Sequence, residues 1–168
     1  MSNTKINKNT VPEDFTLSLA LVDALPVLFF GAIMIVISLL FKSILFLLGA
    51  VLCFYAGAAK VIWKIIVAIK KKNIWWLFMQ LRIVMPIGFL MMIIAVIIEK
   101  DKINIHKLGN AFISFPSIIF FIIGIIGIIL MTIFAIKLDS SDSKANWIEQ
   151  LTNGIAQCAI FIGLLLLL

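Results

Sequence analysis

Histidine, cysteine and charged residues are scarce in this chain of 168 residues, and each shortage excludes a kind of chemistry. His106 is the single histidine and has no cysteine nearby, so a histidine-based metal site or nucleophile has little support. Asp139 and Asp142 are too few to bind a metal and are better interpreted as caps of the helix that follows. Cys53 and Cys158 lie near the middle of apolar segments, where a free cysteine behaves as a small hydrophobe. No glycine-rich phosphate loop, Gly-x-Ser-x-Gly or HExxH motif is present, so the sequence indicates no catalytic, metal or cofactor site.

Charged residues make up 13% of the chain and hydrophobic residues 64%, with a mean hydropathy of +1.23. A typical soluble domain has about 25% charged residues, so this composition excludes a soluble fold. Several uninterrupted apolar runs reach the ~20 residues that an α-helix needs to cross a hydrocarbon core about 30 Å thick. The short segments of alternating polarity that a transmembrane barrel requires are absent from the sequence. We therefore predict an all-α, polytopic transmembrane helical bundle.

The apolar runs divide the chain into a short tail and a single transmembrane domain. Residues 1–14 are polar and show no periodic apolar pattern, so we expect them to form a flexible cytoplasmic tail. The domain, residues 15–168, is expected to contain five spans, at about 24–41, 44–64, 74–98, 113–136 and 147–168. Lys42 and Ser43 are the only polar interruption between the first two apolar runs, which predicts a tight antiparallel hairpin.

Prolines and glycines are expected to influence the geometry of the spans. Pro26 lies close to the start of the first span, where a helix tolerates proline if it begins there. Pro86 and Gly88 lie in the middle of the third span and predict a kink or a freed carbonyl group. Gly124 and Gly127 lie on one side of the fourth span, where they can admit the backbone of a neighbouring helix.

Positive charge is most concentrated at residues 70–72, and the positive-inside rule places this loop in the cytoplasm. The N-terminus is then cytoplasmic, while the C-terminus and the loop that contains His106 are outside. Four tryptophans fall at the predicted cytoplasmic ends of spans, a depth that indole rings favour: Trp63, Trp75, Trp76 and Trp147. Because orientation explains the net charge of +6, we expect no nucleic-acid partner. High isoleucine and lysine usage suggests an AT-rich bacterial genome, and therefore the bacterial inner membrane.

The first half of the last span is unusually polar. Asn146, Glu149, Gln150, Asn153 and Gln157 recur at the spacing that puts them on one face of an α-helix. We call these five residues the polar face. Amide and carboxylate side chains at membrane depth cannot contact lipid at low cost, so the polar face must look into the protein.

Charged residues at the same predicted depth are expected to complete a pocket opposite the polar face. Counting residues from the hairpin turn puts Asp23, Lys60 and Lys64 at the same height in the membrane. A charge at this depth usually pairs inside the bundle, so we expect Asp23 to pair with Lys60 or Lys64. Glu149 is expected to pair with Arg82. The predicted ligand-binding residues are Asp23, Lys60, Gln80, Arg82, Glu149, Asn153 and Gln157.

Simpler interpretations of these residues stay open. Lys60 and Lys64 can extend their ammonium groups to the lipid headgroups, which needs no ligand. The amides of the polar face can form hydrogen bonds between helices, worth ~1 kcal/mol each, that only hold the bundle together. The functional alternative is a cavity open to the cytoplasm, in which Arg82 and Lys60 attract an anionic group and the amides orient it.

Three functions follow from these alternatives. In the first, the protein binds or transports a small solute, for example an anionic one, or a lipid, through this pocket. In the second, it is a non-catalytic membrane scaffold or regulatory subunit. In the third, it is a lipid-modifying enzyme that uses Glu149 or Asp23 as an acid or base, but no second catalytic group has a recognisable spacing. Since five spans make a slim bundle, we expect a second copy or a partner membrane subunit in addition to the lipid bilayer.

Overall fold

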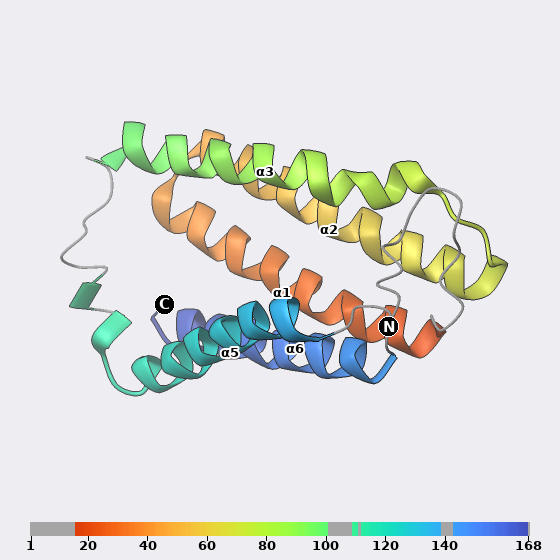
Figure 1. Ribbon diagram of the computed structural model, residues 1–168. Helices are drawn as coiled ribbons and strands as arrows, with labels where there is room; N and C mark the ends of the chain where they lie inside the picture. Colours follow the sequence, from red (N-terminus) through yellow and green to blue (C-terminus); the bar gives the residue numbers. More distant parts are fainter. Residues whose placement is uncertain (1–15, 101–108, 111, 139–142, 168) are drawn as a thin grey trace.

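Long helices make up most of the structure. The computed structural model describes residues 16–100, 109–110, 112–138 and 143–167. Within these residues five helices are long and apolar enough to cross a membrane (Figure 1): α1 (Leu17–Phe41), α2 (Ile44–Lys70), α3 (Trp75–Ile98), α5 (Ser117–Lys137) and α6 (Ser143–Leu165). The described residues contain no strand. The predicted all-α bundle of five spans is confirmed.

Close packing of the helices follows the order α3, α2, α1, α6, α5. Figure 1 shows α1 between two helix pairs, with α2 and α3 on one side and α5 and α6 on the other. Consecutive helices in the chain are therefore neighbours within each pair, while α1 joins the two pairs through its contacts with α2 and α6. This order places α6, which carries the polar face, beside α1 rather than beside α3.

The predicted hairpin between the first two helices is confirmed, and local hydrogen bonds explain it. Lys42 adopts the left-handed conformation with φ 48°, and its backbone N–H donates to the Ser38 carbonyl at 2.9 Å, which ends α1. The next residue, Ser43, caps α2 because its hydroxyl accepts from the Phe46 N–H at 3.0 Å. Lys71 ends α2 in the same left-handed conformation. Two residues thus suffice to reverse the chain at Lys42 and Ser43.

Some helix boundaries differ from the expected ones. Our expectation that a helix begins near Pro26 is wrong, because α1 begins after Thr16, whose hydroxyl accepts from the Leu19 N–H at 3.3 Å, and continues through Pro26. The fourth span begins at Ser117 rather than at 113, because Pro116 has no N–H for the helical ladder and its ring crowds the preceding turn. Helices α2 and α6 are also longer toward Lys70 and Ser143 than the spans expected there.

Three expectations concern segments outside the described residues. They are the flexible tail of residues 1–14, the position of His106 in an outside loop, and helix capping by Asp139 and Asp142.

Glycines mark the closest approaches between helices. A Cβ atom added to Gly88 of α3 would lie 2.6 Å from the Gly49 carbonyl oxygen of α2, so the two backbones touch at this crossing. Gly124 and Gly127 of α5 face Ala156 of α6, which confirms that these glycines admit a neighbouring backbone. These contacts fix how far each helix is rotated about its own axis, and therefore which side chains look inward.

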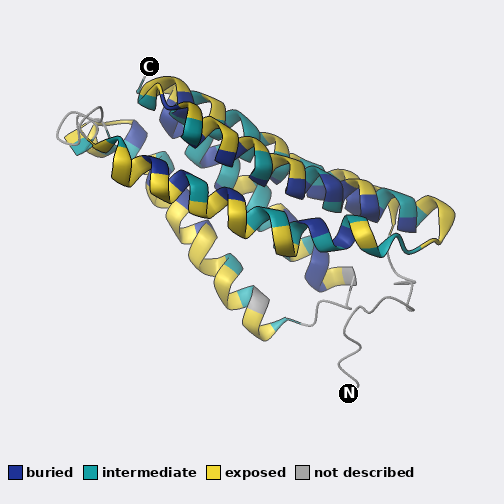
Figure 2. Ribbon diagram, turned by 90° about the horizontal axis from the view of Figure 1, so that it is seen from above, coloured by how far each residue is buried: buried dark blue, intermediate teal, exposed yellow. Residues whose placement is uncertain are grey.

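Most of the outer surface of the bundle is apolar. Figure 2 shows exposed residues along the outward side of every helix, and on α5 they cover most of the circumference. The exposed side chains are mainly isoleucine, leucine, valine and phenylalanine. A water-soluble protein would bury such residues, whereas a hydrocarbon environment accommodates them at no cost.

Candidate functional site

A buried ion pair joins α1 to α2. The Nζ atom of Lys64 lies 2.9 Å from Oδ2 of Asp23, and the two side chains are only 4% and 8% exposed. The expected pairing of Asp23 with one of the two lysines is therefore confirmed, and the partner is Lys64. The snorkelling alternative is wrong for Lys64, because its ammonium group is turned inward to the carboxylate.

Next to this ion pair lies a cavity of about 280 Å³, which we call the polar cavity. Its volume is near the lower end of the range for small-molecule sites, about 300–1,000 Å³. All five helices contribute to its wall: Asp23, Pro26, Val27 and Phe30 of α1, Cys53, Gly57 and Lys60 of α2, Leu81 and Met85 of α3, Met131 of α5, and Glu149, Gln150, Asn153 and Gln157 of α6. The helices are therefore arranged in a curve, so that α3 and α5, at its two ends, both line the polar cavity.

Four residues of the polar face line the polar cavity, as their spacing on α6 predicts. They are Glu149, Gln150, Asn153 and Gln157. Within the described part of the chain, none of the four side chains forms a hydrogen bond or ion pair, although Gln150 is only 7% exposed. The polar atoms of these four side chains are still accessible from the cavity, since none of them is among the fully buried, unpartnered side-chain atoms of the described residues. The face is thus directed at the contents of the cavity and not at another helix.

Lys60 lies one helical turn from Lys64, but the surroundings of its side chain are different. It lines the polar cavity, is half-buried, and forms no hydrogen bond or ion pair among the described residues. Its nearest charged groups are Lys64 and Arg82, which are cationic, and Asp23 and Glu149, which are anionic. Lys60 and these four neighbours together carry one net positive charge. A net positive charge attracts anions, and a low dielectric such as that of a membrane interior strengthens the attraction.

Arg82 and Gln80 lie outside the lining of the polar cavity. Arg82 is exposed, and its guanidinium carbon lies 5.0 Å from the centre of the Phe78 ring, in the position of a cation–π contact. The expected ion pair between Glu149 and Arg82 is wrong, since no such pair occurs in the described residues. Gln80 is buried, but its amide donates to the Trp76 carbonyl of its own helix at 3.1 Å.

Apolar clusters flank the polar cavity on the sides that face the two ends of the bundle. We call the end with residues 70–72 the lysine end and the opposite end, with Lys42 and Ser43, the hairpin end. At the lysine end, Leu19, Trp63, Val67 and Phe78 form a buried cluster, and Trp75 and Trp147 pack against it. Each helix that meets this cluster reaches the cavity about one turn further along. The cluster thus occupies the end at which we expected the cavity to open.

Three of the predicted interfacial tryptophans belong to this cluster. Trp63 is fully buried, and its indole N–H donates to the Asn73 side-chain oxygen at 3.0 Å. Trp75 and Trp147 are half-buried, and Trp76 alone of the four is strongly exposed. All four lie at the lysine end as expected, but Trp63 acts as a core residue instead of an anchor in the headgroups.

At the hairpin end, aromatic and aliphatic side chains close the space above the polar cavity. The Phe30 ring of α1 lies 6.4 Å from the Phe89 ring of α3, centre to centre. Ile33, Phe121 and Leu164 form a second buried cluster, which joins α1, α5 and α6. The charged and amide side chains that line the polar cavity therefore lie between these apolar clusters, while two buried serines, Ser38 and Ser117, lie toward the hairpin end.

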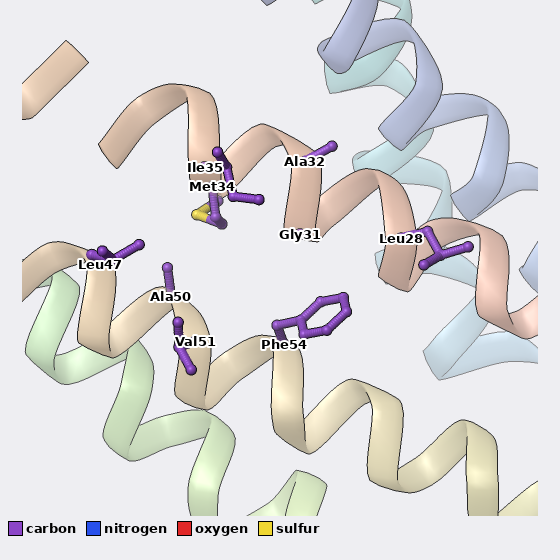
Figure 3. Close-up of a pocket in the computed structure, with 9 residues that line it drawn as sticks. All are labelled: Leu28, Gly31, Ala32, Met34, Ile35, Leu47, Ala50, Val51 and Phe54. Atoms are coloured by element: carbon purple, nitrogen blue, oxygen red, sulfur yellow. The ribbon is translucent and has the colours of Figure 1, made fainter. Parts of the chain in front are cut away.

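A separate groove between α1 and α2 has a purely apolar lining (Figure 3). Its volume is about 330 Å³, and the residues drawn in the figure are Leu28, Gly31, Ala32, Met34, Ile35, Leu47, Ala50, Val51 and Phe54. Gly31 makes room for the Phe54 ring, because a Cβ atom there would lie 2.6 Å from it. In a bilayer this groove faces lipid tails. It contains no group that can recognise a polar ligand.

Sequence reasoning missed several residues of the polar cavity. Gln150 was part of the polar face but not of the predicted ligand-binding set, and its helical spacing was a sufficient signal. Met85 and Met131 have no such signal, because a methionine in an apolar span can face lipid, a helix or a cavity. In the described residues no group of three or more histidine, cysteine, aspartate or glutamate side chains is placed to hold a metal ion.

The length and apolar composition of the five helices in the described residues define a multi-pass membrane protein. No family model matches the chain, and comparison with curated proteins and with solved structures finds no significant match. The polar cavity is therefore the feature from which a function can be inferred.

Proposed function

We propose that this protein binds a small anionic group, belonging to a solute or a lipid headgroup, in the polar cavity, as the binding step of a membrane transporter or carrier. The observation that carries the proposal is that five polar side chains around one cavity form no hydrogen bond or ion pair within the described residues: Lys60, Glu149, Gln150, Asn153 and Gln157. Lys60 offers an ammonium group to the anion. The amides of Gln150, Asn153 and Gln157 can donate to its remaining oxygens, as in other sites that recognise anions.

The alternative role of a scaffold receives less support from these side chains. A polar seam between helices would show hydrogen bonds from α6 to a neighbouring helix, and the four cavity-lining residues of the polar face form none in the described chain. The interhelical ion pair between Asp23 and Lys64, next to the cavity, already serves that structural purpose. An enzymatic role has no support beyond the presence of Glu149, for which no catalytic partner lies in the described residues.

Ligand-induced stabilisation of the purified protein tests the proposal. The protein is placed in nanodiscs of phosphatidylcholine and heated with inorganic phosphate, glycerol 3-phosphate or added phosphatidylglycerol. A ligand at 100 times its Kd stabilises the folded state by about 2.7 kcal/mol, which raises Tm measurably. Lys60→Met should remove this gain and leave the protein folded, because Lys60 forms no hydrogen bond or ion pair with the part of the chain that the structure describes.

Lys70→Met is the matched control, since Lys70 is an exposed lysine at the end of the same helix. It should keep the full stabilisation. If none of the three probes stabilises the wild-type protein, or if Lys60→Met responds as the wild type does, binding of an anion in the polar cavity is excluded.

A further inference from the structure

We propose that the anion is the phosphate of a membrane lipid, and that the lipid enters the polar cavity sideways from the bilayer, through a portal between α3 on one side and α5 and α6 on the other. This inference rests on the proposed function and names its ligand class: an amphiphile with one phosphodiester charge and hydroxyl groups beside it. The observations that carry it are the order of helix packing, the closed ends of the cavity, the exposed Arg82 and the mixed lining.

The portal follows from the helix packing. Among the described helices, α3 packs closely against α2 but not against α5 or α6. Nevertheless Leu81 and Met85 of α3 line the same cavity as Met131 of α5 and Glu149 of α6. The wall between these helices is therefore made by side chains and not by tight backbone contact such as the one between Gly49 and Gly88. Unbranched, flexible methionines such as Met85 and Met131 can change rotamer to admit a ligand at little cost.

Apolar layers lie between the polar cavity and both ends of the helices. The cluster of Trp63, Phe78, Leu19 and Val67 lies between the cavity and the lysine end. The Phe30 and Phe89 rings lie between the cavity and the hairpin end. A free, strongly hydrated phosphate would have to cross one of these layers, whereas a lipid in the bilayer already lies beside the portal with its tails solvated.

Arg82 is placed to bring a lipid headgroup to this portal. It follows Leu81, which lines the cavity, yet its own side chain is exposed, and it is close enough to Lys60 to interact electrostatically. At ~1.5 Å per residue, Arg82 lies roughly 10 Å along the helix from Trp75. An exposed arginine at this depth is costly in hydrocarbon and draws a phosphate towards itself. A phosphate bound at Arg82 would then move from Arg82 to Lys60.

The lining of the polar cavity suits such an amphiphile. On one side, Lys60 is available for the phosphate, and Glu149, Asn153 and Gln157 can accept hydrogen bonds from headgroup hydroxyls. On the other side, Val27, Phe30, Leu81, Met85 and Met131 offer an apolar wall that a hydrated solute does not need. A glycerol–phosphate headgroup fits the polar side of the cavity, and acyl chains that remain in the portal fit the apolar side.

Native mass spectrometry and thermal unfolding, on the full chain, test this inference with a lipid and a soluble phosphomonoester that share a glycerol–phosphate unit. One is phosphatidylglycerol mixed into phosphatidylcholine nanodiscs, and the other is soluble glycerol 3-phosphate. We expect retained phosphatidylglycerol and a raised Tm only with the lipid. Lys60→Met should weaken lipid retention by about tenfold to a hundredfold, as the loss of a charged hydrogen-bond partner does. Arg82→Gln should slow the uptake of the lipid, while Lys137→Gln, an exposed control on α5, should not.

Each of the other outcomes contradicts the lipid inference, and one of them also contradicts the proposed function. If glycerol 3-phosphate stabilises the protein through Lys60 and the lipid does not, the proposed function stands and the lipid inference falls. If phosphatidylglycerol is retained equally by wild type and Lys60→Met, it is only a lipid at the outer surface, and the inference falls. If neither probe has a Lys60-dependent effect, both the inference and the proposed function fall.

Discussion

Lys60 and Lys64 lie one helical turn apart on α2, but only Lys64 is buried beside a carboxylate. Lys64 is buried against Asp23, so its charge is neutralised within the protein. Lys60 lies at the cavity and has no direct partner among the described residues. Removing one member of a buried pair leaves the other charge unpaired in a low dielectric, which is far more costly than removing a charge that has no partner.

The buried ion pair leads to a prediction about stability. Asp23→Asn should destabilise the protein by about 3–5 kcal/mol, because the buried ammonium group of Lys64 then loses the carboxylate that lies 2.9 Å from it. The double variant Asp23→Asn with Lys64→Met should recover most of this loss. Reversible unfolding in a denaturing detergent measures both changes, with Lys60→Met as the unpaired comparison. Equal losses in the single and the double variant would show that the pair is not coupled.

Gln157 and Gln80 provide a matched pair of amides on different helices. Gln157 lines the polar cavity and has no hydrogen bond within the described residues, while Gln80 is buried outside the cavity and donates to the Trp76 carbonyl. We expect Gln157→Leu to preserve the stability of the ligand-free protein and to reduce the shift in Tm caused by phosphatidylglycerol. Gln80→Leu should preserve that shift. A large loss of ligand-free stability in Gln157→Leu alone would instead indicate a structural seam.

At the scale of elements, glycines determine how closely neighbouring helices pack. The crossing of α2 and α3 has backbone contact at Gly49 and Gly88, and Cys53 completes it by donating from its thiol to the Met85 carbonyl at 3.5 Å. Because this crossing sets the rotation of α3, it also decides that Leu81 and Met85 face the polar cavity while Arg82 faces outward. Tight packing of α2 with α3 leaves α3 free of close contact with α6.

A methyl group at this crossing tests the idea. Gly88→Ala would put a Cβ atom 2.6 Å from the Gly49 oxygen and 3.0 Å from the Cys53 nitrogen. Neither is the end of a flexible side chain, so we expect a loss of about 1–3 kcal/mol from overpacking. Gly154→Ala is the control, since nothing lies within 4 Å of its added Cβ, and it should be neutral or stabilise α6 by up to about 1 kcal/mol. Equal effects of the two substitutions would contradict the backbone contact.

At the scale of the whole molecule, the structure is a stack of layers along the helix axes. Apolar clusters lie toward both ends and the polar layer lies between them. The orientation of this stack in the membrane stays a prediction, based on the positive-inside rule, and so does association with a second copy or a partner subunit. Orientation decides from which leaflet a lipid reaches the portal, and with the lysine end in the cytoplasm this is the inner leaflet.

Cysteine labelling in whole cells measures the orientation. Lys42→Cys is a better outside probe than a cysteine at Ser43, because Lys42 is exposed whereas Ser43 is a buried helix cap. A membrane-impermeant maleimide should modify Lys42→Cys in intact cells and Lys72→Cys only after lysis. The unsubstituted protein is the control, because Cys53 and Cys158 lie within spans. Modification of Lys72→Cys in intact cells would reverse the predicted topology.

Much of this protein was determined by its sequence alone, for a physical reason. Hydropathy varies along the chain and reports how deep each residue lies in the membrane, so it predicts the five spans and the turn at Lys42 and Ser43. Counting residues from that turn then predicts the common height of Asp23 and Lys64. Helical periodicity likewise placed Glu149, Asn153 and Gln157 on one face of α6. These properties need no knowledge of neighbouring helices.

The rotation of each helix about its axis was decided only by the tertiary structure. It depends on which small side chains let which backbones touch, as at Gly49 and Gly88, and no hydropathy pattern contains that information. For this reason Arg82, predicted inside the pocket, lies outside it, and Met131, with no polar signal, lines it. The same packing decided that Lys64 pairs with Asp23 and that Lys60 is left to face the cavity.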